Sequence, residues 1–407
     1  MIHPLEDRYR TRIADIFEEQ SRIDKMVQVE VALAKAHLEQ GTLTEEEYTQ
    51  LLDGEGEVSV DLVKKIEQET LHETMALVEA LTRVTGCDKV HIGATSSDIL
   101  DTVLALQMKE AHNLIIADVL LLKDLLLKKA EETKDLICIG RTHGQHALPM
   151  TYGMKFALWA YELGECINTI KDTKFYGKMS GAVGTFASFG EKGPEIQNQV
   201  MKQLDLCVPL IANQIVSRIF IAQYLFGLIS MVAVIEKMAR EVRNLQRSEI
   251  QEVAEAFSKK QTGSSTMGHK KNPITSENLC SLAKRLRTNI LPALENVSLE
   301  HERDMSNSGN ERIIIPETFI LTHYMVLRIS QILETLVLFE VNIDRNLNMN
   351  PAILMEKKMV ELITKEGLGR QEAYRKAKTT FLDAKPSDYI GLSRQTVTRV
   401  IKKLRND

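Results

Sequence analysis

The sequence of 407 residues contains little proline, few aromatic residues and few of the signals that mark β-hairpins. There are 9 prolines, aromatic residues make up 5% of the chain, and no Asn-Gly dipeptide occurs. Because proline interrupts helices and Asn-Gly favours tight hairpins, their scarcity favours long helices over sheets. Hydrophobic residues reach 44%, which excludes a disordered chain. The composition therefore predicts an all-α globular fold.

Cysteine usage and charge exclude further classes of protein. The five cysteines form no Cys-x-x-Cys pair, so we expect reduced thiols in a cytoplasmic protein, with neither a disulfide framework nor a zinc site. The first ten residues contain no apolar stretch, and we expect no secretory signal. With 51 basic against 56 acidic residues, the net charge of −5 gives no general attraction for nucleic acid.

A long apolar run, residues 219–235, is the strongest candidate for a membrane helix. Gln223 and Ser230 interrupt it, and Arg218 and Glu236 flank it closely. A spanning helix needs about 20 apolar residues. The run therefore predicts a helix buried on all sides in a bundle, and no membrane association.

Apolar residues recur with helical spacing through most of the chain, for example at Val27, Val31, Ala34 and Leu38. The predicted helices are short before residue 91, long from there to about 341, and short again afterwards. This pattern predicts an N-terminal helical domain (1–90), a central long-helix bundle domain (91–341) and a small C-terminal helical domain (342–407). The central domain is interrupted by three polar loops: 140–149, 177–193 and 258–273.

The loop 258–273 is a candidate for chemistry. It contains two glycine hinges, Gly263 and Gly268, and two adjacent hydroxyls before Lys270. A mobile serine beside a cation and a helix N-terminus can act as a base. The loop ends in Asn272-Pro273, which predicts an N-cap followed by the first helical residue. A solvated surface loop has the same composition.

Three other segments combine polar groups. Arg141-Thr-His-Gly-Gln-His146 places two imidazoles beside a guanidinium, although a lone histidine is more often structural. The segment 91–98 ends in Thr95-x-x-Asp98, which predicts a capping box at a helix N-terminus able to bind an anion; an ordinary N-cap is the alternative. Arg303 and Arg312 bracket two serines, a set that suits phosphate or forms a surface ion-pair cluster.

The C-terminal segment 391–404 resembles the recognition helix of a helix-turn-helix, the one hint of DNA binding. An amphipathic terminal helix with a solvated basic face explains it equally well.

Taken together, these segments resemble the fumarase/aspartase superfamily. Gly263-Ser-Ser-Thr-Met-Gly-His-Lys-Lys-Asn-Pro273 is similar to its signature loop, and 91–98 and 141–145 are similar to its other two active-site segments. The similarity runs from Arg8-Tyr9 to residues 369–374. Within the superfamily, three segments resemble the adenylosuccinate lyases more than argininosuccinate lyase or fumarase: 180–184, 245–249 and 302–312.

The resemblance implies an enzyme that releases fumarate from adenylosuccinate and from the succinyl-carboxamide ribotide of purine synthesis. It implies a D2 homotetramer whose active sites each draw on three chains, with neither a metal nor an organic cofactor. By resemblance, Ser264 is the base and His143 the general acid, which Glu277 orients, while Lys270 and Asn272 hold a substrate carboxylate. His72 is implied as a further catalytic histidine. The remaining implied substrate contacts are His91, Thr95, Ser96, Gln214 and Met267, with Arg8, Tyr9, Arg303, Ser308 and Arg312 around the nucleotide phosphate.

The sequence departs from the family pattern at Gly268 (usually Pro), Glu73 (usually Asp), Asn307 (usually His) and Gly309 (usually Ser). Two alternatives stay open. Another fumarate-releasing lyase or a carboxymuconate cycloisomerase would share the fold and chemistry, but its substrate lacks the phosphate that the arginines suit. A non-catalytic helical scaffold or DNA-binding protein would need none of the implied catalytic residues.

Overall fold

The computed structural model describes residues 4–256, 271–379 and 384–406. Helices dominate this part of the chain, and the predicted all-α fold class is confirmed. The helices are α1 (Arg12–Ile16), α2 (Glu19–Glu39), α3 (Glu45–Gly54), α4 (Val60–Thr70), α5 (Glu73–Thr85), α6 (Ser96–Glu132), α7 (Tyr152–Ile170), α8 (Gly193–Gln203), α9 (Ile219–Leu245), α10 (Ile274–Arg287), α11 (Ile290–Glu295), α12 (Ser308–Thr335), α13 (Glu340–Leu347), α14 (Met355–Glu366), α15 (Arg370–Thr379) and α16 (Ser393–Asn406). Short 3₁₀ helices are η1 (Pro4–Glu6), η2 (Glu55–Glu57), η3 (Gly190–Lys192), η4 (Pro351–Leu354) and η5 (Pro386–Tyr389).

The chain divides into two compact units, each assembled from three separate stretches. The first unit comprises Met1–Ala117, Thr169–Ile229 and Arg285–Tyr324, and the second comprises Asp118–Asn168, Ser230–Lys284 and Met325–Asp407. Three long helices, α6, α9 and α12, begin in the first unit and end in the second. The predicted domain boundaries near residues 90 and 341 stay a prediction.

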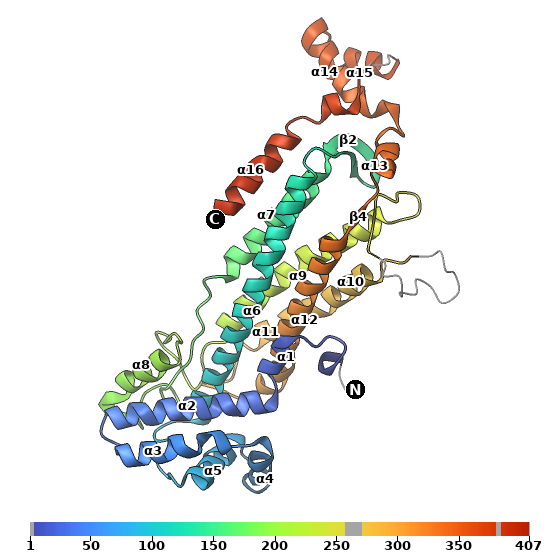
Figure 1. Cartoon of the computed structure of the whole chain (residues 1–407). Helices are drawn as coiled ribbons and strands as arrows, with labels where there is room; N and C mark the ends of the chain where they lie inside the picture. The colour runs from blue at the N-terminus through green and yellow to red at the C-terminus, as the bar shows by residue number, and fades with distance from the viewer. Residues whose placement is uncertain (1–3, 257–270, 380–383, 407) are drawn as a thin grey trace. The chain divides into compact units, whose positions relative to one another are not determined.

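In the first unit, α2, α3, α5 and α8 enclose one hydrophobic core (Figure 1). Leu33 of α2, Leu77 of α5 and Val200 of α8 are fully buried in it. Side-chain caps mark the starts of two of these helices: Thr44 and Glu47 form a capping box at the start of α3, and His72 caps α5. Because the helix ends are fixed locally, the core can hold the segments that follow α5 in defined positions.

Two helices among the described residues, α9 and α12, are long and apolar enough to cross a membrane. However, 56% of the apolar window of α9 and 67% of that of α12 are buried inside the protein, as is typical of core helices. The prediction of a bundle helix over 219–235 therefore agrees with most of α9. One face of α9 is exposed, however, with Ile219 and Phe220 each 36% and Phe226 58% exposed, so the helix is not buried on all sides within one chain.

The second unit contains a β-hairpin where the sequence predicts a polar loop. Strand β1 (Ile137–Thr142) pairs antiparallel with β2 (Gln145–Thr151), and Thr142 lies opposite Gln145. The two turn residues, His143 and Gly144, have φ values of 53° and 74°, as a type I′ turn requires. The prediction of a loop over 140–149 is wrong because histidine, like asparagine, tolerates the left-handed conformation. A second short pair joins β3 (Val253–Ala254) to β4 (Val337–Leu338).

The C-terminal helices of the second unit pack in two groups. Leu362 of α14 contacts Ala373 and Ala377 of α15 in a small core. Helix α16 buries Val397, Ile401 and Leu404, and Lys123 donates a hydrogen bond to the Leu404 carbonyl at 3.3 Å. Its apolar face is therefore used for packing, which favours the amphipathic terminal helix over a DNA recognition helix.

Candidate active site

A cavity of about 260 Å³ in the first unit collects basic side chains from segments far apart in the sequence. It lies between the start of α2, the N-terminal part of α6, and the starts of α9 and α12. Its polar lining includes Arg22, Ser97, Arg303, Asn307, Ser308 and Arg312. Three of the five residues predicted around a phosphate thus share one cavity. Arg8 and Tyr9 are not among its lining residues, and Tyr9 packs edge-on against Tyr324 with the ring centroids 5.1 Å apart.

Arg303 connects segments that the sequence singled out separately. Its Nη1 donates hydrogen bonds to Ser97 Oγ at 2.8 Å and to Gln214 Oε1 at 3.1 Å. The Nε of Arg303 and both polar side-chain atoms of Asn307 are buried without a hydrogen-bond partner among the described residues. Because buried polar atoms are normally bonded, these atoms indicate a cavity that holds a polar ligand or water.

Glu73 lies between two of the arginines. Its carboxylate pairs with Arg22 through one oxygen and with Arg312 through the other, the latter at 3.0 Å. Burial alone would raise the pKa of Glu73, but the two guanidiniums outweigh burial and lower it. The glutamate that replaces the usual aspartate is therefore an ionised bridge, and Arg22 is an additional cation that the sequence did not single out.

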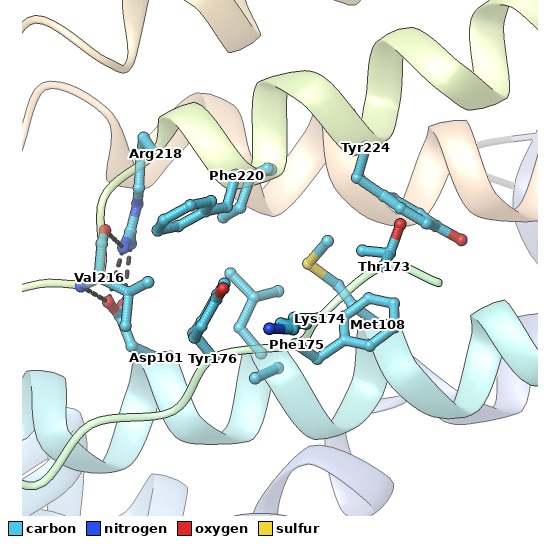
Figure 2. A pocket seen from close by; sticks show the side chains of 13 residues that line it. Asp101, Met108, Thr173, Lys174, Phe175, Tyr176, Val216, Arg218, Phe220 and Tyr224 are labelled. Atoms are coloured by element: carbon cyan, nitrogen blue, oxygen red, sulfur yellow. Dashed lines mark hydrogen bonds and ion pairs between the residues drawn. The ribbon is translucent and has the colours of Figure 1, made fainter. Parts of the chain in front are cut away.

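Arg218 has two carboxylate partners at the edge of the same cavity. It donates to Asp101 of α6 and to Glu311 of α12, with Nη1 2.6 Å from Asp101 Oδ2 and Nε 2.9 Å from Glu311 Oε1. Figure 2 shows the bonds that join Arg218 to Asp101 and Val216, beside a second cavity of about 40 Å³ lined by aromatic rings. That volume holds at most a few waters. The cluster therefore fixes the starts of α9 and α12 relative to α6.

The N-terminus of α6 has the predicted cap. The Thr95 N–H donates to Asp98 Oδ2 at 2.8 Å, and the fully buried Asp98 also pairs with Lys178. The same carboxylate accepts the N–H groups of Ser180 and Gly181 at 2.9 and 3.1 Å. Asp98 is thus committed to the fold. One of the two bonds of the predicted capping box is present, while the Asp98 N–H donates to the Thr95 carbonyl oxygen.

Two histidines flank this helix terminus, and their Nδ1 atoms have opposite kinds of partner: a backbone N–H for His72 and a carboxylate for His91. His72 is the N-cap of α5: its Nδ1 accepts the Met75 N–H at 3.3 Å, and its Nε2 lies 3.5 Å from Ser96 Oγ. His91 has its Nδ1 2.6 Å from Glu30 Oε1. Since a ring nitrogen that accepts must lack a proton, neutral His72 carries its proton on Nε2. One small region at the start of α6 therefore contains Thr95 and Ser96 together with the two predicted histidines.

Gly184 is a point of close backbone approach near Gln214. It has φ +80°, and a Cβ atom at this position would overlap the carbonyl oxygen of Ala212. Asn213 then accepts the Ile215 N–H at 3.1 Å, which turns the chain at Gln214. Gly184 thus lies against the backbone just before Gln214, whose side chain accepts from Arg303.

We expect Gly184→Ala to destabilise the protein by about 1–3 kcal/mol more than Gly190→Ala. Gly190 is the matched control, because its φ is also positive (+65°) but nothing lies within 4 Å of the added Cβ. Thermal unfolding of both variants measures the difference. Equal melting temperatures would show that the contact with Ala212 does not constrain this region.

In the second unit, His143 lies exposed in the hairpin turn, and strand β1, which leads into the turn, is held by a buried ion pair. Arg141 Nη2 donates to Glu252 Oε1 at 2.6 Å, and the fully buried Glu252 also accepts from Tyr152 at 3.2 Å and from Asn346 at 2.9 Å. Arg141 therefore anchors the hairpin through Nη2, while its Nη1 is buried without a hydrogen-bond partner among the described residues. His146 is partly buried, and burial together with Arg141 lowers its pKa.

Glu277 lies exposed in the first turn of α10, and the described residues show no hydrogen bond between it and His143. Helix α10 begins at Ile274, one residue later than predicted, so Asn272 is not the N-cap. The carboxylate of Glu255 provides the cap instead, accepting the N–H groups of Ser276 at 2.7 Å and Thr275 at 3.3 Å. Five residues singled out in the sequence lie outside the described residues: Gly263, Ser264, Met267, Gly268 and Lys270.

The chain is similar to known enzymes over most of its length. A family model described as "Lyase" matches residues 5–287. Adenylosuccinate lyase of Pyrococcus horikoshii is 41% identical, and the match covers 98% of this chain and 97% of the relative. The Pyrococcus abyssi adenylosuccinate lyase is 40% identical with the same coverage. This chain belongs to the adenylosuccinate lyase family.

Among solved structures, the 3-carboxy-cis,cis-muconate lactonizing enzyme of Pseudomonas putida matches this adenylosuccinate lyase family member with a TM-score of 0.89 at 25% identity. The match covers 99% of each chain. Enzymes other than adenylosuccinate lyases thus share this fold. The residues of the site, and not the fold, distinguish one enzyme from another.

The sequence analysis missed Arg22, Glu30 and Glu252, which contact predicted site residues or line the cavity. Each lies in an ordinary helical or loop pattern with no local signal. Only an alignment of relatives, in which a buried charge pair is retained, offers a signal for such residues.

Proposed function

We propose that this protein eliminates fumarate from adenylosuccinate, giving AMP, and from the succinyl-carboxamide ribotide of purine synthesis, giving the carboxamide ribotide. The observation that carries the proposal is the cavity that combines Arg22, Arg303 and Arg312 with the hydroxyls of Ser97 and Ser308. Guanidiniums and hydroxyls together suit a phosphate monoester, which both substrates carry. A cycloisomerase of the same fold has no such group to bind.

The elimination needs a base, a stabilised carbanion and an acid. The base removes a proton from the carbon next to a carboxylate, and the doubly charged aci-carboxylate that results must be stabilised by cations and N–H donors. The C–N bond then breaks, and the leaving nitrogen takes a proton. We assign Ser264 as base, Lys270 and Asn272 as carboxylate ligands, and His143 as acid.

The N-terminus of α6 supplies the second anion site of the proposal. Thr95 and Ser96 provide hydroxyls where the first N–H groups of this 37-residue helix are available. The helix dipole adds partial positive charge at the same place. We therefore assign these two residues to a substrate carboxylate, with His72 beside them within 3.5 Å of Ser96.

We propose further that the working enzyme is a homotetramer with shared active sites. The first unit has a groove of about 620 Å³ whose lining includes Phe220, Phe226 and Leu294. Phe226 and Leu294 are 58% and 52% exposed, and an apolar groove of this kind marks a protein interface. His143 and Glu277 are exposed and unbonded to each other, as expected if they meet across chains. Light scattering should give four times the 46.0 kDa chain mass.

The same proposal makes the protein soluble and cytoplasmic, without a nucleic-acid partner. Its two long apolar helices are mostly buried, and the basic C-terminal helix is packed through its apolar face. The substrates are soluble nucleotides, so neither a membrane nor DNA is needed for the reaction.

A substrate panel tests the assignment. Purified protein is given adenylosuccinate, argininosuccinate or malate, and fumarate is measured by its ultraviolet absorbance. We expect fumarate from adenylosuccinate alone. Release from argininosuccinate or malate instead would assign the protein to another branch of the superfamily.

A further inference from the structure

Glu30 is a fully buried carboxylate whose two oxygens both bind one residue. Glu30 Oε1 lies 2.6 Å from His91 Nδ1, and Oε2 accepts the His91 backbone N–H at 3.1 Å. Glu30 is on α2, 61 residues before its partner. A buried carboxylate costs several kcal/mol unless it is paired, and the partner of Glu30 is His91, which occupies both of its oxygens.

The backbone around His91 is held as firmly as its ring. His91 has φ +59°, in the left-handed region that histidine, like asparagine, tolerates better than most residues other than glycine. The following Ile92 carbonyl is bonded to His37 Nε2 at 2.9 Å, and the Gly93 carbonyl accepts from Ser188. These contacts come from α2 and from the loop before α8, and they fix the chain just before it enters α6.

The hydrogen-bonding state of the ring follows from its partner. A carboxylate only accepts, so His91 carries a proton on Nδ1. The described residues show no hydrogen bond to His91 Nε2, which leaves that atom for a ligand. Burial alone would lower the pKa of His91, but the hydrogen bond and charge of Glu30, with Asp98, outweigh it and raise the pKa. Asp98 is itself paired with Lys178.

We propose that Glu30 is a positioning residue, which holds His91 so that its Nε2–H is offered to an anionic group of the substrate beside the N-terminus of α6. The inference rests on the proposed function for the identity of the substrate. Glu30 itself touches no reacting atom, since both of its oxygens are occupied by His91. It acts by fixing the orientation and charge of the imidazole.

A double-mutant cycle tests this role. The variants are Glu30→Gln, His91→Asn and the pair together; asparagine is chosen because it accepts the positive φ. We expect Glu30→Gln to raise KM for adenylosuccinate about tenfold, as for loss of one charge-assisted hydrogen bond, with a smaller change in kcat. In the His91→Asn background the same substitution should change KM little. Additive effects would overturn the inference.

Glu317→Gln is the matched control. Glu317 is also a buried carboxylate of the first unit, accepting from Arg285 at 2.7 Å and from Asn289 at 2.9 Å. Its substitution should lower the melting temperature as Glu30→Gln does, but leave KM unchanged. A tenfold rise in KM for Glu317→Gln would mean that loss of any buried charge produces the effect.

A second measurement does not depend on activity. Because the pKa of His91 is raised in the folded protein, its stabilisation is present below the pKa of a free imidazole, about 6.5, and is lost as the pH rises through the folded-state value. The melting temperature of wild type minus that of His91→Asn should therefore be larger at about pH 5.5 than at about pH 8.5. In the Glu30→Gln background this pH dependence should vanish.

The two readouts separate failure of the inference from failure of the proposed function. Wild-type protein that releases no fumarate from adenylosuccinate would contradict the proposed function, while the thermal comparison would still decide whether Glu30 holds His91 in its charged form. An unchanged pH dependence in the Glu30→Gln background would overturn the inference even in an active enzyme.

Discussion

Replacing His143 by asparagine is expected to reduce turnover of adenylosuccinate by about 10²–10⁴-fold, the usual contribution of a general acid. The substitution is chosen to leave the hairpin intact. His143 and Gly144 adopt φ values of 53° and 74° at the turn, and Asn-Gly is the dipeptide that favours this turn most. The side chain is exposed, so no packing is lost. Turnover is measured from fumarate absorbance, and folding from the melting temperature.

His146→Asn is the matched control for this prediction. His146 is on the same hairpin, opposite Arg141 in the strand register, and has no assigned role in the reaction. It should retain most of the wild-type turnover. Near-normal activity of His143→Asn, or inactivity of His146→Asn alone, would mean that the wrong imidazole is assigned as the acid.

Replacing Arg218 by alanine is expected to destabilise the protein by about 3–5 kcal/mol, the largest stability effect that we predict. Arg218 is 6% exposed and is the shared partner of Asp101 and Glu311, which are 7% and 8% exposed. Without the guanidinium, the buried carboxylates of Asp101, shown beside Arg218 in Figure 2, and of Glu311 lose the cation that they share. Urea unfolding at a fixed protein concentration gives the change in free energy.

Arg83→Ala is the control for Arg218. Arg83 pairs with Glu79 on the surface of α5, with side chains 50% and 42% exposed. An exposed pair of this kind is worth less than about 1 kcal/mol, so little change is expected. Similar losses for the two variants would contradict the view that burial makes the Arg218 cluster important.

Local sequence patterns predicted the helices well because helix formation depends on neighbours in the chain. The spacing of Val27 and Ala34 marked the buried face of α2, and Thr95-x-x-Asp98 marked the start of α6. The hairpin at 137–151 was missed because its turn is His-Gly and its second strand contains Pro149, which usually argues against a strand.

The charge pairs that shape the site were not predictable from one sequence. Arg22 and Glu73 are 51 residues apart, and Arg218 and Asp101 are 117 apart. No local pattern connects such residues, because their pairing depends on how helices from separate stretches pack. The resemblance to a family located Arg303, Ser308 and Arg312, which the structure gathers in one cavity, but it gave no indication of Glu30 or Glu252.

The central claim is that this chain eliminates fumarate from adenylosuccinate through Ser264. The most direct test measures fumarate and AMP together, from adenylosuccinate, for wild type and for Ser264→Ala at matched protein concentration. We predict equal amounts of the two products from wild type and a loss of about 10²–10⁴-fold in the variant. Fumarate release by Ser264→Ala at the wild-type rate would contradict the assignment of the base, and no release by folded wild-type protein would contradict the function.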